Sequence, residues 1–306
     1  MPEDRPSSPF DRLRTRWLVV QFLLLMAAAL LVYDRLGRVA GAGGAAFGGN
    51  ERLGATLVYC ALGLVLLVRG KFARLNWRGL FGRLPTRAEL PLLAVVVPVD
   101  LLTLGATMAV FIPLSYVAPR FVERIVLGPN DLLDARSFGQ WLGVVLLASV
   151  VAPFVEELFF RGILLHRWAR RWGTGTAVVA SSLLFAVLRG EWIGHFLFGV
   201  AMCALYLRSR TLWLPILAHA VSNLAIALTG LPDALSHAPS EPDTLASLRS
   251  QWPFGVLALA AGAVLLWWYV RRYWASSRLR AVFAGPVPYD VYAASATGSP
   301  DSTSAS

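Results

Sequence analysis

The sequence has few charged residues and few cysteines for its length. Only 15% of its 306 residues are charged, 57% are hydrophobic, and the mean hydropathy is +0.59. A soluble core cannot bury that much apolar surface. The two cysteines, Cys60 and Cys203, both lie inside apolar runs, so neither a disulfide framework nor a thiolate metal site is indicated. The composition therefore predicts an all-α polytopic membrane protein.

The formal net charge of +10 could suggest a nucleic-acid partner. The basic residues, however, form short clusters between apolar runs, which is typical of inward-facing membrane loops. We therefore expect the lipid bilayer as a partner and no nucleic acid.

Eight apolar runs predict about eight transmembrane helices. The runs cover residues 17–33, 53–68, 90–117, 140–172, 176–188, 192–207, 212–228 and 253–270. With the N-terminus in the cytoplasm, the inside segments hold most of the lysines and arginines, whereas the outside loops hold acids. The pattern predicts a multi-pass protein with both termini cytoplasmic.

Four parts follow from this division of the chain. Residues 1–139 hold three N-terminal transmembrane helices and their loops, and residues 140–229 form a core that holds most of the intramembrane polar residues. Residues 230–272 form an outer loop and the last transmembrane helix. Residues 273–306 form an Ala/Ser/Thr/Gly-rich cytoplasmic tail that we expect to be disordered.

The most informative stretch is 153–162, which carries Glu156, Glu157 and Arg161 inside an apolar run. Ionisable groups at membrane depth are costly unless they are paired or face a cavity, so they indicate a functional site. Glu157 and Arg161 have the i, i+4 spacing of an ion pair, and Glu156 points about 100° away around the helix. One carboxylate can thus be neutralised while the other is left for chemistry.

Other polar residues lie at a similar depth. Glu156 and Arg189 stand at nearly equal numbers of residues before and after Gly173, so each is about 25 Å from that turn. His219 and Asn223 have i, i+4 spacing and project from one face of the run 212–228, about 15 and 21 Å from the next cytoplasmic turn. These residues are therefore expected to meet within the hydrocarbon region.

At these residues the chain resembles the CPBP family of intramembrane proteases, which includes the type II CAAX prenyl endopeptidases and bacteriocin-processing relatives. Glu156, Glu157 and Arg161 match the first motif of the family, two glutamates, three residues and arginine. His219 and Asn223 match its third motif, histidine, three residues and asparagine. The resemblance covers residues 140 to 228.

The resemblance implies an intramembrane endopeptidase with a CPBP-like helical core in an inner (cytoplasmic) membrane. In the family the first glutamate helps to activate a water, so Glu156 becomes the general base. Glu157 with Arg161 becomes the orienting pair, and His219 with Asn223 become the oxyanion donors. The implied partner is a membrane-anchored peptide or protein, such as a lipidated or prenylated substrate, a bacteriocin-like peptide or a C-terminal sorting tail.

The second motif departs from the family. Phenylalanine, three residues and histidine are expected, but the chain has Phe185 followed by Arg189. Three explanations are open: His195 takes the role, Arg189 holds Glu156 or a substrate carboxylate, or the chain has lost activity. An arginine cannot shuttle protons at neutral pH, and beside Glu156 it would oppose that group as a base.

The CPBP family has been described both as metalloproteases and as glutamic proteases, so the resemblance leaves open whether the site holds a metal. The sequence contains no His-Glu-x-x-His, and only Glu156, His195 and His219 could supply a two-histidine, one-carboxylate set for zinc. Since Arg189 would oppose a cation, we expect a metal-free site with a glutamate-activated water.

Two other classes of function remain. A catalytically inactive relative would use the same polar cavity as a membrane adaptor or immunity protein, which explains Arg189 most simply. A proton-relay transporter would show inverted repeats with broken helices, and no convincing repeat is present. Outside the motifs, the sequence predicts a helix-capping or an interhelical hydrogen-bonding role for Asp100 and an interfacial position for His166.

Overall fold

The computed structural model describes residues 9–13, 16–21, 24, 48–127, 137–189, 192–236, 244–274 and 283–288. Every element within these ranges is helical, and no strand occurs among them. The expected all-α polytopic class is thereby confirmed. The expected helix 17–33 and the tail 273–306 lie mostly outside the described residues.

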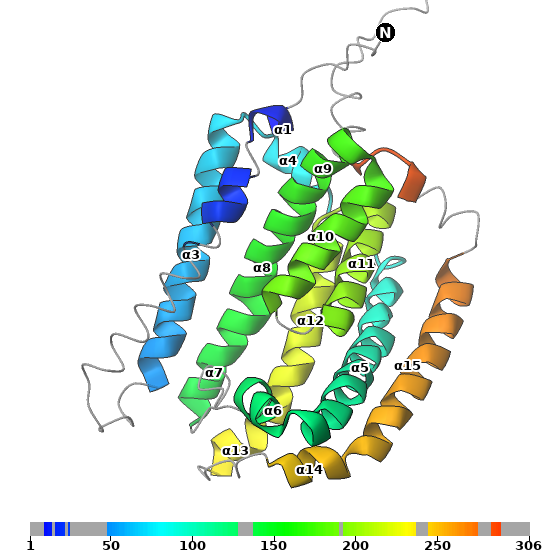
Figure 1. Ribbon diagram of the computed structural model, residues 1–306. Coiled ribbons are helices and arrows are strands. Elements are labelled where there is room, and N and C mark those ends of the chain that lie inside the picture. The colour runs from blue at the N-terminus through cyan, green and yellow to red at the C-terminus, as the bar shows by residue number, and fades with distance from the viewer. Residues whose placement is uncertain are drawn as a thin grey trace, which may run out of the picture.

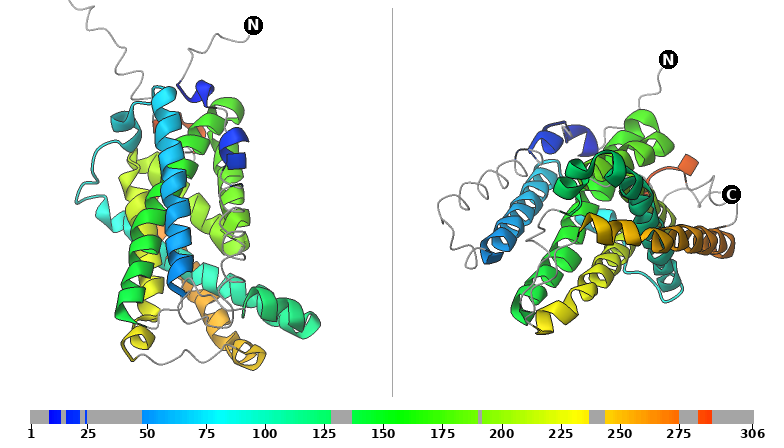
Figure 2. Two further views of the ribbon diagram at one scale, coloured as in Figure 1. Left: turned by 90° about the vertical axis from the view of Figure 1, so that its left-hand side faces the viewer. Right: turned by 60° about the horizontal axis from the view of Figure 1, so that its bottom comes forward.

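Four helical stretches are long and apolar enough to cross a membrane: Leu90–Val117, Phe138–Trp172, Trp192–Ser209 and Trp252–Tyr273. Two shorter apolar helices, α10 (Thr174–Arg189) and α12 (Trp213–Thr229), pack with them. Helix α3 (Gly48–Phe72) and helix α15 (Trp252–Tyr273) lie at opposite edges of the bundle (Figures 1 and 2). The number of membrane crossings, about eight, stays a prediction.

The remaining elements complete these stretches or cap the two ends of the bundle. The stretch Leu90–Val117 consists of a 3-10 turn, η2 (Leu90–Val95), and α5 (Val96–Val117), and α11 is Trp192–Ser209. The short capping helices are α1 (Pro9–Arg12), α4 (Trp77–Phe81), α6 (Pro119–Ile125), α13 (Leu231–Ser236) and α14 (Leu245–Ser250).

The outer surface of the bundle is apolar. On α15, for example, Phe254 is 67% exposed, Leu257 is 65% exposed and Trp267 is 57% exposed. Such a surface is unfavourable in water but suits contact with lipid tails. The described helices thus form a membrane protein.

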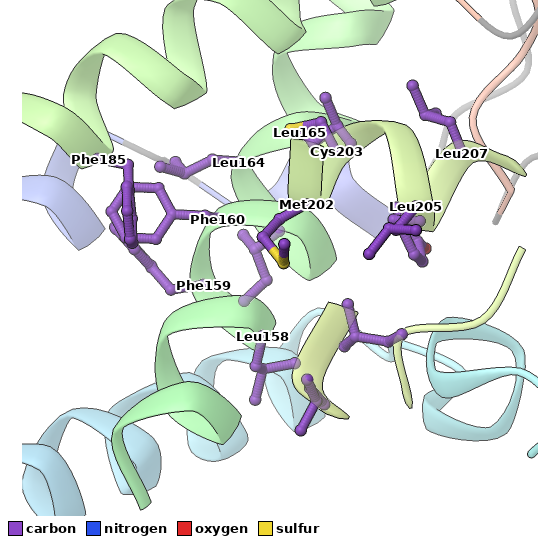
Figure 3. Close-up of a cluster of buried hydrophobic side chains, with 14 of the residues drawn as sticks. Leu158, Phe159, Phe160, Leu164, Leu165, Phe185, Met202, Cys203, Leu205 and Leu207 are labelled. Carbon is purple, nitrogen blue, oxygen red and sulfur yellow. The ribbon is translucent and has the colours of Figure 1, made fainter. Parts of the chain in front are cut away.

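The first-motif glutamates lie on a central rod that contains two π-helical segments. It runs through α7 (Phe138–Leu146), the π-helical segment η3 (Leu147–Val151), α8 (Ala152–Glu157), a second π-helical segment η4 (Leu158–Leu164) and α9 (Leu165–Trp172). Segments α8 and η4 are almost entirely buried, and η4 contributes Leu158, Phe159 and Phe160 to the hydrophobic core (Figure 3). This burial places the motif at the centre of the bundle.

The first π-helical segment accommodates Pro153. Proline has no N–H, and its ring crowds the preceding turn of an α-helix. In a π-helix the N–H of residue 153 would donate to the carbonyl of Ala148. Because Pro153 has no N–H, this carbonyl receives no backbone hydrogen bond from it. The side chain of Asn223 on α12 donates to that carbonyl, with 2.6 Å between Nδ2 and the oxygen. A neighbouring helix thus satisfies the backbone group that proline leaves unpaired.

Helices α5 and α15 approach closely because glycines line their contact. A Cβ atom on Gly105 would lie 2.7 Å from the backbone nitrogen of Leu259 and 2.8 Å from the backbone oxygen of Gly255. Gly262 is equally tight, since a Cβ there would lie 2.9 Å from the nitrogen of Leu102. Small residues that let backbones approach are a common means of helix association in membranes.

Segments near both ends of the chain pack at the same end of the bundle. The ring of Phe10, in α1, stacks on His166 in α9 at 4.8 Å between centroids. The Thr174 hydroxyl, at the start of α10, donates to the carbonyl of Gly285 at 2.7 Å. Figure 1 shows α1 and the segment 283–288 near α9. Both segments therefore lie on the side of the Gly173 turn, as the expected topology requires.

Candidate active site

The Glu157–Arg161 ion pair expected from their spacing is present and inaccessible to solvent. Nη1 of Arg161 lies 2.7 Å from Oε1 of Glu157, and the two side chains are 1% and 0% exposed. Nη2 of Arg161 donates to the carbonyl of Gly199 at 3.0 Å. The guanidinium also lies over the ring of Phe185, 5.1 Å from its centroid. One glutamate is thus neutralised within the bundle.

His219 connects the two glutamates. Its Nδ1 lies 2.8 Å from Oε1 of Glu157, and its Nε2 lies 3.8 Å from Oε2 of Glu156. Because an ionised carboxylate only accepts hydrogen bonds, Nδ1 carries the proton of this contact. In the neutral ring Nε2 is then an acceptor that faces Glu156.

Glu156 is held by two residues from other helices. Nη2 of Arg189 lies 2.9 Å from Oε1 and 2.7 Å from Oε2 of Glu156. The hydroxyl of Tyr59, on α3, donates to Oε1 at 2.6 Å. The equal distances of Glu156 and Arg189 from Gly173 predicted this meeting, whereas Tyr59 was not anticipated. The sequence feature that could have pointed to Tyr59 is a hydroxyl within an apolar run, ten residues or about 15 Å before the basic cluster that begins at Arg69.

The charges of the cluster balance when His219 is neutral. Two guanidinium groups, Arg161 and Arg189, face two carboxylates, Glu156 and Glu157. Burying a net charge is costly, so this balance favours the neutral imidazole with a free Nε2.

Aromatic rings form the walls of the site. The ring of Phe198 lies 4.9 Å and that of Phe185 lies 6.0 Å from the ring of His219, both edge to face. Phe185 also lies 5.6 Å below the guanidinium of Arg189. The phenylalanine of the second motif therefore contacts both arginines and the histidine.

Asn223 and Asp100 make structural contacts beside the site. The side chain of Asn223 donates to the carbonyl of Ala148, as described above, and makes no hydrogen bond with the glutamates among the described residues. The hydroxyl of Ser222 lies 2.8 and 3.0 Å from the two carboxylate oxygens of Asp100, on α5. Of the two roles expected for Asp100, the interhelical hydrogen bond is confirmed, and Ser222 is a partner that the sequence did not indicate.

Among the described residues, the histidines other than His219 lie outside the cluster of glutamates and arginines. The expected position of His166 at the depth of the membrane interface stays a prediction, and within the bundle its side chain is fully buried, with Phe10 stacked on its ring and the Tyr206 hydroxyl 3.2 Å from its Nε2. His195 lies beside Phe185, at 5.9 Å between ring centroids. His237 lies outside the described residues.

The residues of the site do not fit a divalent metal. Within the described ranges no group of three or more His, Cys, Asp or Glu side chains is arranged to hold one, so the set Glu156, His195 and His219 is not gathered as ligands. The guanidinium of Arg189 already contacts both oxygens of Glu156, and a cation there would be repelled. Nδ1 of His219 is committed to Glu157.

The site is thus a buried cluster of two carboxylates, two guanidiniums and an imidazole inside an apolar helical bundle. Residues 138–225 match the family model described as type II CAAX prenyl endopeptidase Rce1-like. This match supports, for residues 138–225, the resemblance to the CPBP family that the motifs indicate.

One curated relative supports the same assignment. The protein "Putative membrane peptidase YdiL" of Bacillus subtilis (strain 168) is 28% identical over 92 residues, which cover 29% of this chain and 37% of that protein. The chain thus spans little more than a third of this relative's length. No solved structure gives a significant match.

Proposed function

We propose that the protein is an intramembrane endopeptidase that hydrolyses a peptide bond of a membrane-anchored substrate. The observation that carries the proposal is the facing pair of Glu156 and His219, with 3.8 Å between Oε2 and Nε2. A carboxylate and a neutral imidazole nitrogen at this separation can together bind and deprotonate one water. The CPBP-family core supports the same chemistry.

In the proposed reaction, the water lies between Oε2 of Glu156 and Nε2 of His219. Its oxygen attacks the carbonyl carbon of the peptide while its proton moves toward Glu156 and His219. Arg189 already contacts both oxygens of Glu156, so Nε2 of His219 is the final acceptor of the proton. The resulting imidazolium donates the proton to the leaving nitrogen as the C–N bond breaks.

The remaining residues have supporting roles in this proposal. Glu157, fixed by Arg161, accepts from Nδ1 of His219 and stabilises the imidazolium that forms. The imidazolium Nε2–H and the guanidinium of Arg189 are the donors available to the oxyanion. Asn223 holds the π-helical segment before Pro153 and thereby positions Glu156.

We propose an inner-membrane location with both termini in the cytoplasm, from the distribution of basic loops. The proposed substrates are lipidated, bacteriocin-like or C-terminal sorting-tail peptides, reached from within the bilayer. The proposed reaction uses no metal, since Arg189 occupies the carboxylate that zinc would need.

A second candidate function rests on the same ion pair. Nη2 of Arg189 contacts both oxygens of Glu156, which is also the arrangement of a locked, inactive site. Such a protein would bind a partner helix as a membrane adaptor or immunity protein.

One experiment separates the two functions. Purified wild type, Glu156→Ala, Arg189→His and the control Glu123→Ala, at an exposed acid of α6, are incubated in nanodiscs with membrane-anchored reporter peptides. Mass spectrometry then reads cleavage with and without a chelator. If the protein is a hydrolase, wild type and Glu123→Ala should cleave the reporter with and without chelator, and Glu156→Ala should not cleave it. If wild type is silent and only Arg189→His cuts, the protein is a binding relative.

A further inference from the structure

The guanidinium of Arg189 has donors that Glu156 does not use. Both contacts with Glu156 come from Nη2 alone. A guanidinium carries five N–H donors and no acceptor. Among the described residues, Nη1 and Nε of Arg189 have no hydrogen-bond partner, whereas both Nη atoms of Arg161 are engaged. Arg189 therefore keeps hydrogen-bonding capacity beside the proposed reaction centre.

The unused part of this side chain is accessible. The side chain of Arg189 is 32% exposed, compared with 1% for Arg161. Arg189 is the last residue of α10, so it stands where the hairpin with α11 turns. A group that enters at this end of the hairpin can reach the guanidinium while Nη2 stays on Glu156.

The position of the guanidinium is fixed by its neighbours. The ring of Phe185, one turn earlier on α10, lies 5.6 Å below it. Its partner Glu156 is held in turn by the hydroxyl of Tyr59, which donates to Oε1 at 2.6 Å. The unused N–H donors of Nη1 and Nε match a second acceptor that is planar and negatively charged, and in peptides such an acceptor is a carboxylate.

We infer that Arg189 is a specificity-determining residue that binds a carboxylate of the substrate next to the scissile bond. The inference rests on the proposed hydrolysis at Glu156 and His219. The carboxylate is either the free C-terminus of the substrate or an acidic side chain near the cut. This role also explains why an arginine stands at the end of α10 in a chain whose other motif residues are kept.

The test uses three peptides that share one transmembrane segment and one short polar end. The first ends in a free C-terminal acid, the second in an amide, and the third is the amide with one Asn of the polar end replaced by Asp. Their binding is measured by fluorescence and their cleavage by mass spectrometry in phosphatidylcholine nanodiscs. The proteins are wild type, Arg189→Gln, Arg189→Lys and the control Arg271→Gln, at an exposed residue of α15.

Wild type and Arg271→Gln should prefer the free acid over the amide by roughly 10- to 100-fold, the range of a hydrogen bond between charged groups. Arg189→Gln should bring that ratio close to one, and Arg189→Lys, which keeps the charge, should keep part of it. Recovery by the Asp-containing amide assigns the carboxylate to a side chain, and no recovery assigns it to the C-terminus.

A wild-type ratio near one for both the acid and the Asp-containing peptide overturns the inference, whether or not the variants fold. Cleavage without this preference leaves the hydrolysis standing and removes the role of Arg189. Tight, carboxylate-dependent binding without cleavage leaves the role of Arg189 standing and removes the proposed hydrolysis. The two failures are therefore distinguishable.

Discussion

Replacing the two members of the buried ion pair between Glu157 and Arg161 should have unequal effects on the stability of the bundle. At 2.7 Å, two unit charges attract by about 6 kcal/mol at an effective dielectric constant of 20, which desolvation largely offsets. Arg161→Met removes the guanidinium and leaves a buried charge on Glu157, whose Oε2 already has no hydrogen-bond partner. We expect a loss of about 3–5 kcal/mol in the free energy of unfolding.

Glu157→Gln should cost less, about 2–3 kcal/mol: it leaves the buried guanidinium of Arg161 without a counter-charge, but the amide oxygen can still accept from Arg161 and from His219. In the double variant no unpaired charge of the pair remains. Its loss should therefore fall at least about 2 kcal/mol short of the sum of the single losses.

Reversible unfolding in mixed micelles, followed by circular dichroism, measures all three variants against wild type. Arg271→Gln, on the exposed face of α15, is the matched control and should change the free energy by less than about 0.5 kcal/mol. Additive single losses, or a cost below about 1 kcal/mol for Arg161→Met, would refute the role assigned to the pair.

Three further predictions concern the site, a loop and the packing of helices. Tyr59→Phe removes a hydrogen bond to the carboxylate of Glu156 and should lower reporter cleavage about 10-fold at unchanged fold; equal rates would contradict its positioning role. The hydrogen bonds from Arg83 hold the pKa of Glu89 at about 2, below its ordinary value of 4.5. The stability that this carboxylate contributes is therefore present above pH 4.5 and lost as the pH falls toward 2, and it stays below about 1 kcal/mol because the pair is screened by solvent. Unfolding curves of wild type and Glu89→Gln should converge over that window, and a constant difference would exclude the pair as its cause. Gly105→Ala forces a Cβ to within 2.7 Å of backbone and should destabilise the protein by about 1–3 kcal/mol, whereas Gly139→Ala, with nothing within 4 Å, should be neutral or stabilising in thermal unfolding.

Much of the helical architecture could be predicted from hydropathy alone. The run 90–117 coincides with the helical stretch Leu90–Val117, and the runs between 140 and 228 differ from the observed helices by only a few residues. The i, i+4 rule predicted the pair of Glu157 and Arg161, and counting from Gly173 predicted that Glu156 meets Arg189.

Other contacts depend on information that spacing does not carry. The π-helical segments rotate the rod before and after Glu156, so the direction of Asn223 relative to it could not be derived from an ideal helix. Tyr59 comes from a helix whose rotation about its own axis is set by packing. His166 has a basic, interfacial sequence context, and its burial depends on contacts with Phe10 and Tyr206, which are distant in sequence.

The stacking of Phe10 on His166 matters for anyone who attaches a reporter to this protein. A tag or fluorescent fusion that replaces α1, instead of preceding it, would remove a ring that lies 4.8 Å from a fully buried imidazole. The segment 283–288 imposes the same care at the other end of the chain, because Val287 is only 2% exposed. Fusions that retain residues 9–13 and 283–288 should report the membrane topology without disturbing the helix that carries the glutamates.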